Sequence, residues 1–276
     1  MKKILAVSGG IDSVVLLHLF KDEDPIVAHF DHGIRPNSRD DAAFVWSLAQ
    51  KYGLRFELGQ AKLGDKCGEA EARSRRYAFL GDLSKKYDAT VCVAHHADDV
   101  LESIAINLIR GTGWRGIAPM NASGIERPLL KWRKADIYRY ASEHDLSFRQ
   151  DQTNTEGDYL RNRVREKMRD VPESTKQAIL ELYMKQTQLL DEYAAIMDDI
   201  FSGNNRDYCT KAIIQDSPDD CALEIMRFYM AERGLSLTRP QLKKCVEAVR
   251  KYSPKKRLSL NHERFLEVNK YSFHVV

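Results

Sequence analysis

The sequence predicts an α/β protein whose first half forms a mainly parallel sheet, followed by a long helix and a small α+β domain. Short apolar runs alternate with segments of helical periodicity in the first half of the chain. One long amphipathic segment follows, and short alternating runs end the chain. Strands that alternate with helices are typical of βαβ units, in which neighbouring strands are parallel.

The elements of the first half differ in length and periodicity. Short apolar or alternating runs predict strands, and apolar positions three or four residues apart predict helices. The expected strands cover residues 4–7, 26–30, 54–58 and 90–94, and the expected helices cover 14–19, 40–52, 70–86 and 100–109.

The second half changes character at about residue 174. Between 174 and 201 the apolar residues fall on one helical face, which predicts a long connecting helix. Two further helices follow, and the gaps between the last alternating runs suit hairpin turns. These runs are 257–260, 264–268 and 271–275. We therefore expect a first domain over 1–172, a helical linker over 173–204 and a small α+β domain over 205–276.

The composition is that of a globular chain with a sizeable core. Of the 276 residues, 43% are hydrophobic and 30% are charged, and 43 Lys and Arg against 40 Asp and Glu leave a net charge of +3. Such a balance does not by itself indicate nucleic-acid binding, so that question depends on local clusters. The five cysteines form no CxxC pair, which argues against a structural zinc site and a disulfide framework.

The apolar segments also bear on the cellular compartment. No apolar run is long enough to span a bilayer. The N-terminal apolar run Ile4–Val7 ends at Ser8, which is too early for a signal peptide. We therefore expect a cytoplasmic protein with no membrane segment.

A glycine-containing loop between the first strand and the first helix is the strongest candidate binding site. It consists of Ser8, Gly9, Gly10, Ile11, Asp12 and Ser13. Glycines let the backbone bend tightly and approach an anion, and the exposed N–H groups of a helix N-terminus bind phosphate. The alternative is an ordinary capped turn with Asp12 or Ser13 as the cap. The loop lacks the Gly-Lys-Ser/Thr ending of a Walker A motif.

Further polar clusters occur in a definite order after this loop. They cover residues 29–35, 69–77, 94–103, 110–113, 127–130, 151–154 and 159–165. The loop resembles the SGGxDS loop of the PP-loop ATP pyrophosphatase superfamily. Together with these clusters, the chain resembles the tRNA(Ile)-lysidine synthase family over about residues 3–170, and beyond that only in organisation.

The resemblance implies both a fold and an activity. The fold is adenine nucleotide alpha hydrolase-like, which is Rossmann-like, with an ATP-binding catalytic first domain and a last domain that contacts tRNA. The family uses ATP and Mg²⁺ to ligate L-lysine to C2 of the wobble cytidine in isoleucine tRNA with a CAU anticodon. The cytidine is first adenylated with release of pyrophosphate, and lysine then displaces AMP. The family also suggests a homodimer.

Three carboxylates near the start of the expected fourth helix are candidates for binding lysine. Asp98 and Glu102 are four residues apart and Asp99 and Glu102 three apart, so all three can share one end of a helix. Such a site attracts an ammonium group and can accept its proton, since an amine attacks only when neutral. The alternative is that acids in a first helical turn simply favour the helix dipole.

The remaining candidates are mostly basic. Arg73 and Arg76 share a helix face and can stabilise phosphate charge, although Arg73 could instead pair with Glu69. A basic segment carries Arg161, Arg163 and Arg165, which could contact RNA phosphates or simply form a solvated face. With Arg110, we expect these residues and Arg76 to bind tRNA. The resemblance makes Asp31, Arg73, Asp99 and Glu102 catalytic, and Asp12 and Asp31 the candidate Mg²⁺ ligands.

Other interpretations of the same residues stay open. A PP-loop tRNA thiolase is the main alternative, although Cys67 and Cys92 do not form the paired cysteines that this chemistry usually uses. An ammonia-using synthetase of the same fold and an inactive tRNA-binding protein are less consistent with the acid cluster. A zinc site could also be suggested by His29, Asp31, His32, His95 and His96. In the family that the chain resembles, Asp31 instead lies beside the nucleotide loop, and packing alone could account for His29 or His96.

Overall fold

The computed structural model describes residues 2–33, 38–61, 69–120, 124–149, 159–202, 208–251 and 256–276. The chain divides into two compact units, Met1–Thr187 and Gln188–Val276. The division falls inside a single long helix, the one that the sequence assigns to the linker. Within the described ranges, no helix combines the length and apolarity that crossing a membrane requires.

The first unit contains a five-stranded sheet of order β3-β2-β1-β4-β5 in which every described pair is parallel. This confirms the expected α/β class with a parallel sheet. The strands are β1 (Lys2–Ala6), β2 (Ile26–Asp31), β3 (Arg55–Gln60), β4 (Ala89–Cys92) and β5 (Ile125–Glu126). The helices between them are α1 (Ile11–Phe20), η1 (Lys21–Glu23), α2 (Ser38–Lys51), α3 (Glu69–Tyr87), α4 (Ala97–Ile109) and η2 (Trp114–Ile117).

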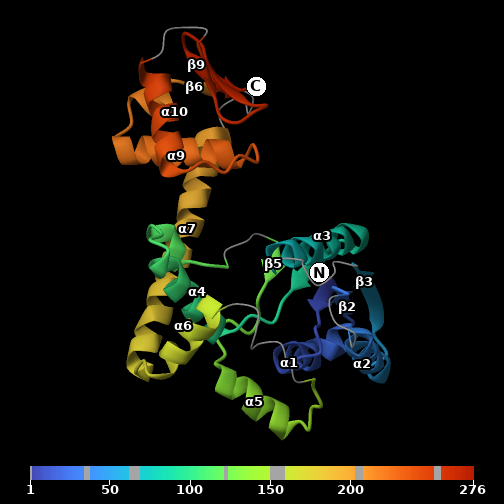
Figure 1. The fold of residues 1–276 in the computed structure, drawn as a ribbon. Helices are drawn as coiled ribbons and strands as arrows, with labels where there is room; N and C mark the ends of the chain where they lie inside the picture. Colours follow the sequence, from blue (N-terminus) through green and yellow to red (C-terminus); the bar gives the residue numbers. More distant parts are fainter. Residues whose placement is uncertain are drawn as a thin grey trace. The chain divides into compact units, whose positions relative to one another are not determined.

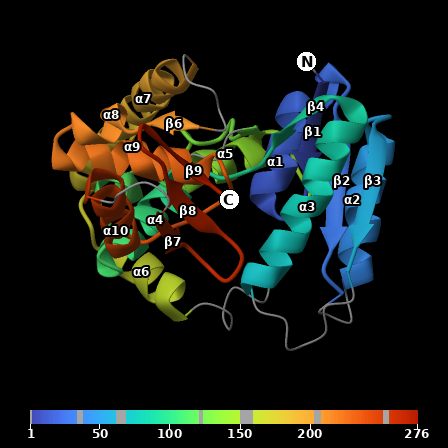
Figure 2. The same ribbon diagram turned by 90° about the horizontal axis from the view of Figure 1, so that it is seen from above.

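Both faces of the sheet are covered by helices. Figures 1 and 2 show α1 and α2 on one face and α3 on the other. The central strand β1 serves both faces because successive side chains of a strand point in opposite directions. Leu5 packs with α1 and α2 residues, and Ile4 packs with α3 residues such as Leu80; all three side chains are almost completely buried.

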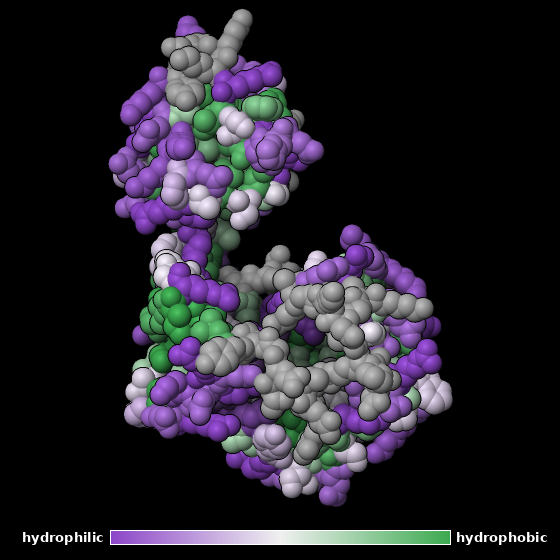
Figure 3. Space-filling view, viewed as in Figure 1, coloured by the Kyte–Doolittle hydropathy of each residue, from purple (hydrophilic) through white to green (hydrophobic). Residues whose placement is uncertain are grey.

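Three helices complete the first part of the chain. They are α5 (Lys134–Glu143), α6 (Tyr159–Arg169) and α7 (Glu173–Ser202). Ile137 and Ala141 of α5 join the core on the α1 face, and α6 packs against α4 with Val164 buried. Figure 3 shows a hydrophobic patch over α4, whose last turn exposes Leu108 and Ile109.

The second unit is a separate α+β structure with its own core. Its antiparallel sheet has the order β6-β9-β8-β7. Its elements are β6 (Cys209–Thr210), α8 (Ala212–Gln215), α9 (Asp219–Ala231), α10 (Arg239–Lys251), β7 (Lys256–Ser259), β8 (Phe265–Val268) and β9 (Ser272–Val275). Two helices and a hairpin-connected sheet were expected here, whereas β6 and α8 are too short to produce a periodic pattern.

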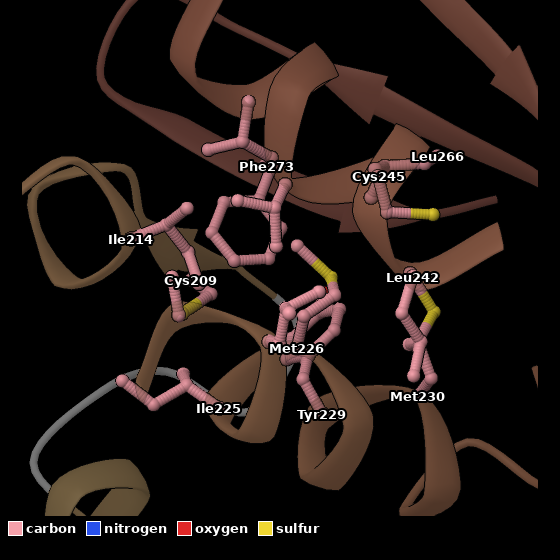
Figure 4. Packing of buried hydrophobic residues seen from close by; sticks show 14 of the residues in the cluster. Cys209, Ile214, Ile225, Met226, Tyr229, Met230, Leu242, Cys245, Leu266 and Phe273 are labelled. Atoms are coloured by element: carbon pink, nitrogen blue, oxygen red, sulfur yellow. The ribbon is translucent and has the colours of Figure 1, made fainter. Parts of the chain in front are cut away.

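Large side chains from the sheet and from both longer helices fill this second core. Phe273 of β9 lies against Tyr229 of α9, with ring centroids 5.0 Å apart in an edge-to-face arrangement. Figure 4 shows both rings among Met226, Leu242 and Leu266, which come from α9, α10 and β8. The second unit is therefore stabilised by its own apolar core.

We expect Phe273→Ala to destabilise the second unit because Phe273 is 0% exposed. Removing a buried aromatic side chain leaves a cavity and typically costs about 3–5 kcal/mol. Chemical unfolding followed by circular dichroism measures this change. Tyr271→Ala is the matched control on the same hairpin, since Tyr271 is 70% exposed. Equal losses for the two variants would contradict the described packing.

Candidate nucleotide and acid site

The loop between β1 and α1 has the geometry of an anion-binding turn. The second serine of the loop, Ser13, accepts hydrogen bonds through Oγ from the backbone N–H groups of Ser8 and Gly9, both at 3.1 Å. The same hydroxyl donates to the Gly10 carbonyl at 2.8 Å. The helix N-cap is Gly10, whose lack of a side chain leaves the N–H groups of the first turn without a side-chain cap. These groups are therefore available to a phosphate.

One glycine of the loop is required by its backbone conformation. Gly9 has φ of +95°, a region that residues with a Cβ rarely adopt. A Cβ at this position would also meet the Phe44 and Val45 side chains at 3.4 and 3.5 Å. An ordinary capped turn does not need this conformation, and a glycine here also leaves the loop backbone open to close approach by a ligand.

The loop lies where a doubly wound sheet usually binds its ligand. Because the strands are parallel, the segments after β1, β2 and β4 all lie at the carboxyl edge of the sheet. The strand order changes direction between β1 and β4, and ligands of open α/β sheets bind in the crevice at such a switch point. The sequence clusters at Asp31 and at His95–Asp99 follow β2 and β4 and reach this edge.

His96 connects the loop to α4. Its Nε2 lies 3.8 Å from Asp12 Oδ1 and 3.6 Å from Asp99 Oδ2. The backbone N–H of His96 donates to Asp99 Oδ2 at 2.9 Å, so Asp99 caps the helix that it belongs to. Asp99 therefore stabilises the start of its own helix, as the helix-dipole alternative expected, and it also lies with Asp98 in the first turn of α4.

Asp98 is held by the turn that starts α5. Arg133 donates to Asp98 Oδ1 from Nη2 at 2.7 Å and from Nε at 3.0 Å, and the Lys134 backbone N–H donates to Oδ2 at 2.7 Å. Burial favours the neutral acid, but these hydrogen bonds outweigh it and lower the pKa of Asp98. Both oxygens of Asp98 are thus used within the protein.

Lys134 reaches back from α5 to the nucleotide loop. Its Nζ donates to Asp12 Oδ1 at 2.6 Å, across 122 residues of sequence. The side chains of Lys134 and Asp12 are 35% and 31% exposed, so the pair borders solvent. Arg133 and Lys134 were not among the residues singled out from the sequence, because only folding brings α5 beside α1.

Glu102 is paired with the basic helix α6. Arg165 donates to its two oxygens, from Nε at 2.6 Å and from Nη2 at 3.0 Å, and Arg161 Nε lies 3.9 Å from Oε2. The hydrogen bond to Glu102 raises the pKa of Arg165. The structure therefore joins two residues that the sequence analysis assigned to different substrates, Glu102 to lysine and Arg165 to tRNA.

Asp99 differs from Asp98 in the direction of its pKa shift. Burial is the main cause that raises its pKa, and the negative charges of Glu102 and Asp12 act in the same direction. A carboxylate with a raised pKa holds a proton more readily than an ordinary one. Of the three acids of α4, Asp99 thus has the environment of a proton acceptor.

The other predicted site residues are more scattered. Asp31 is buried at the end of β2, where its Oδ1 accepts the Gly33 N–H at 2.8 Å. Arg73 and Arg76 lie near the start of α3, on the opposite face of the sheet from α1. Arg110 caps the C-terminal end of α4, about 20 Å from its acidic end given the helical rise. Arg163 is an exposed residue of α6.

Some residues of the sequence clusters fall outside the part of the chain that the structure describes. The segments 34–37, 62–68 and 150–158 lie outside the described residues, as does the side chain of Glu69. They include Cys67 and the cluster 151–154.

The family of the chain follows from comparison with known proteins. The PP-loop domain family matches residues 1–171, so this chain belongs to that family. The tRNA thiolase NcsA of Methanococcus maripaludis has the same fold, with a TM-score of 0.60 at 16% identity, covering 69% of this chain and 73% of that one.

Curated proteins that are similar in sequence to this chain include tRNA(Ile)-lysidine synthases. The tRNA(Ile)-lysidine synthase of Thermotoga maritima is 32% identical over 251 residues, which are 83% of this chain and 60% of the relative. That of Exiguobacterium sibiricum is 37% identical over 174 residues, 60% of this chain and 42% of the relative. The chain thus spans 60% or less of the length of these two relatives.

We expect Asp98→Asn to lower stability in a pH-dependent way. The native pKa of Asp98 lies below its usual 3.8, so the wild type gains stability above the unfolded pKa and loses it as the pH falls through the lowered native value. The unfolding free energy of the variant should therefore fall below that of the wild type at pH 7, with the difference shrinking towards pH 3. Urea unfolding at both pH values measures it.

Asp22→Asn is the control for this prediction, since the Asp22 side chain is 88% exposed and pairs only with its neighbour Lys21 among the described contacts. A difference between Asp98→Asn and the wild type that stays constant with pH would show that the Arg133 contact does not depend on the charge of Asp98.

Proposed function

We propose that this chain is a tRNA(Ile)-lysidine synthase, which ligates L-lysine to C2 of the wobble cytidine in isoleucine tRNA with a CAU anticodon. The observation that carries the proposal is the junction of the phosphate-binding loop with the acidic start of α4, where His96 lies within 4 Å of both Asp12 and Asp99. The names of the curated relatives support the same activity.

The loop from Ser8 to Ser13 would hold the phosphates of ATP. Lys134 is close enough to add a positive charge, because its Nζ already contacts Asp12 of the loop. The cytidine O2 would attack the α-phosphate, and the loop N–H groups would stabilise the pyrophosphate as it leaves.

Mg²⁺ would neutralise phosphate charge, and Asp12 and Asp31 are the carboxylates proposed to hold it. Within the described ranges, no group of three or more His, Cys, Asp or Glu forms a ready metal site. Proteins usually bind Mg²⁺ through one or two carboxylates together with substrate phosphates, and Asp12 and Asp31 would supply such carboxylates. The ion would accordingly enter with ATP.

Asp99 is the proposed proton acceptor for lysine. Asp98 is engaged by Arg133 and Lys134, and Glu102 by Arg165, whereas Asp99 has the raised pKa that suits a base. The lysine ammonium would transfer a proton to Asp99, and the neutral amine would then attack C2 with release of AMP. Glu102 would bind the ammonium once Arg165 shifts towards RNA phosphate.

The basic helix α6 is the proposed tRNA contact near the acid site, through Arg161, Arg163 and Arg165. Guanidinium groups bind phosphate through paired hydrogen bonds, as Arg165 does here with Glu102. Arg110 lies at the other end of α4, so it would contact a different part of the tRNA. The homodimer suggested by the family resemblance can be tested by light scattering.

A tRNA thiolase is less consistent with the described residues. Cys92 lies at the end of β4, and burial, together with the nearby Glu126, raises its pKa to about 12. It therefore stays a neutral thiol at physiological pH and is a poor nucleophile. Cys67 lies outside the described residues.

The proposed activity predicts that the purified chain, with ATP and Mg²⁺, transfers radiolabelled lysine to unmodified isoleucine tRNA carrying a CAU anticodon. Acid-insoluble label measures the reaction, and methionine tRNA in parallel measures discrimination. Label on isoleucine tRNA alone is the expected result. Absence of label from a folded protein that binds both ATP and this tRNA would refute the proposal.

The proposed role of Asp99 predicts that its substitution impairs the use of lysine but not the binding of ATP. Asp99→Asn should lower kcat/KM for lysine by about 100-fold or more, since general base catalysis typically contributes that much. ATP binding, measured by calorimetry, should stay close to that of the wild type. Glu143→Gln, an exposed acid of α5, is the control. Equal losses in lysine use and ATP binding would contradict the assignment of Asp99 to lysine.

A further inference from the structure

The consecutive residues His95 and His96, which follow β4, have different neighbours. His96 is extended, with φ of −124° and ψ of 176°, and contacts Asp12 and Asp99 on the α1 side. In extended backbone, neighbouring side chains point to opposite sides. His95 accordingly faces the α3 side, where arginines are its main charged neighbours.

Three guanidinium groups are the strongest charged influences on His95, after the effect of its burial. Burial lowers its pKa to about 3, and the positive charges of Arg127, Arg73 and Arg76 act in the same direction. Burial likewise lowers the pKa of His32 at the end of β2, with Arg76 as its largest charged influence. Both rings are therefore neutral at physiological pH, and the positive charge of this region comes from the arginines.

Arg127 has hydrogen-bonding capacity that the protein does not use. Its Nη1 donates to the Ile125 carbonyl at 3.0 Å, but its buried Nε has no partner among the described residues, and the same is true of His95 Nδ1 and His32 Nδ1. Burial lowers the pKa of Arg127, and the groups that next affect it are Tyr77, Tyr183 and Arg73, none of which is negative at neutral pH.

Clustered positive charges with unused donors are unfavourable unless a negative group joins them. A buried donor without a partner has lost its hydrogen bonds to water without gaining others, and like charges repel at short range. An anion placed among the three arginines would relieve both penalties. The arrangement therefore indicates a ligand that carries a phosphate or an equivalent anion.

We propose that Arg127 completes a binding site with Arg73 and Arg76 for a phosphodiester of an RNA substrate. The inference rests on the proposed tRNA-modifying function and adds a residue to it. The loop and Lys134, which contact each other on the α1 side of the sheet, are the groups already proposed for the phosphates of ATP. The phosphodiester backbone of the RNA would then bind on the α3 side of the sheet. From there its target cytidine would reach the α-phosphate of ATP.

Arginine chemistry favours a phosphodiester here. A guanidinium is planar and presents paired donors, so it matches two oxygens of one phosphate, whereas an ammonium acts as a point charge. Phosphate contacts position RNA without reading its sequence, so this site would orient the target nucleotide while discrimination between tRNAs lies elsewhere.

The test compares Arg127→Gln, Arg127→Lys and Arg75→Gln in the full chain. Arg75 is the matched control because it lies beside Arg76 on α3, with a side chain that is 64% exposed and 3.9 Å from Glu71. Filter binding of unmodified isoleucine tRNA transcript at several salt concentrations gives the affinity and its salt dependence. Calorimetry gives ATP affinity, and thermal melting reports folding.

Arg127→Gln should bind the transcript about tenfold more weakly. The slope of its log affinity against log salt concentration should become less steep by about one, which corresponds to one lost phosphate contact. ATP affinity should be unchanged, and Arg75→Gln should behave like the wild type. Unchanged RNA affinity and salt dependence in Arg127→Gln would overturn the site, as would a loss confined to ATP binding.

If Arg127→Gln does not fold, Arg127→Lys decides the question. It keeps the charge but loses the paired donors, so weaker RNA binding with intact ATP binding supports the site, and wild-type RNA affinity overturns it. Lysine transfer by the wild type tests the ligase separately. RNA binding that depends on Arg127 without any lysine transfer would keep the phosphate site and refute the ligase proposal.

Discussion

The contact of Asp98 with the start of α5 is the interaction on which the candidate site depends. Asp98 accepts hydrogen bonds from the Arg133 side chain and the Lys134 backbone, and Lys134 in turn reaches Asp12 of the loop. Three helices, α1, α4 and α5, are thereby held at one edge of the sheet. Charge-assisted bonds of this kind are short and directional, so they fix the distance between the loop and the acids.

The acids of α4 have different partners in the structure. Asp98 has a lowered pKa and is used in holding the fold, while Glu102 is bound by arginines of α6. Asp99 has a raised pKa, chiefly because it is buried. Adjacent carboxylates whose environments push their pKa values apart are typical of sites that need both a charged group and a proton acceptor.

The sequence analysis predicted the local features well. The loop after β1, the parallel strands, the long helix α7 and the terminal hairpins were all expected, because each is encoded by residues close together in the chain. It did not predict the roles of Arg133, Lys134 and Arg127. Their partners are distant in sequence, so the local pattern around each residue does not show which groups it will contact.

The sequence by itself determined the class of fold and the chemistry available at the sheet edge. Apolar periodicity fixes which faces are buried, and glycine at a position with positive φ fixes the loop. Only the tertiary structure decided which acid of α4 has a lowered pKa and which has a raised one, which cations contact these acids, and on which side of β4 each histidine lies. Those properties depend on burial and on charges brought together from separate helices, and a pKa or an ion pair exists only once these groups lie within a few ångströms of one another.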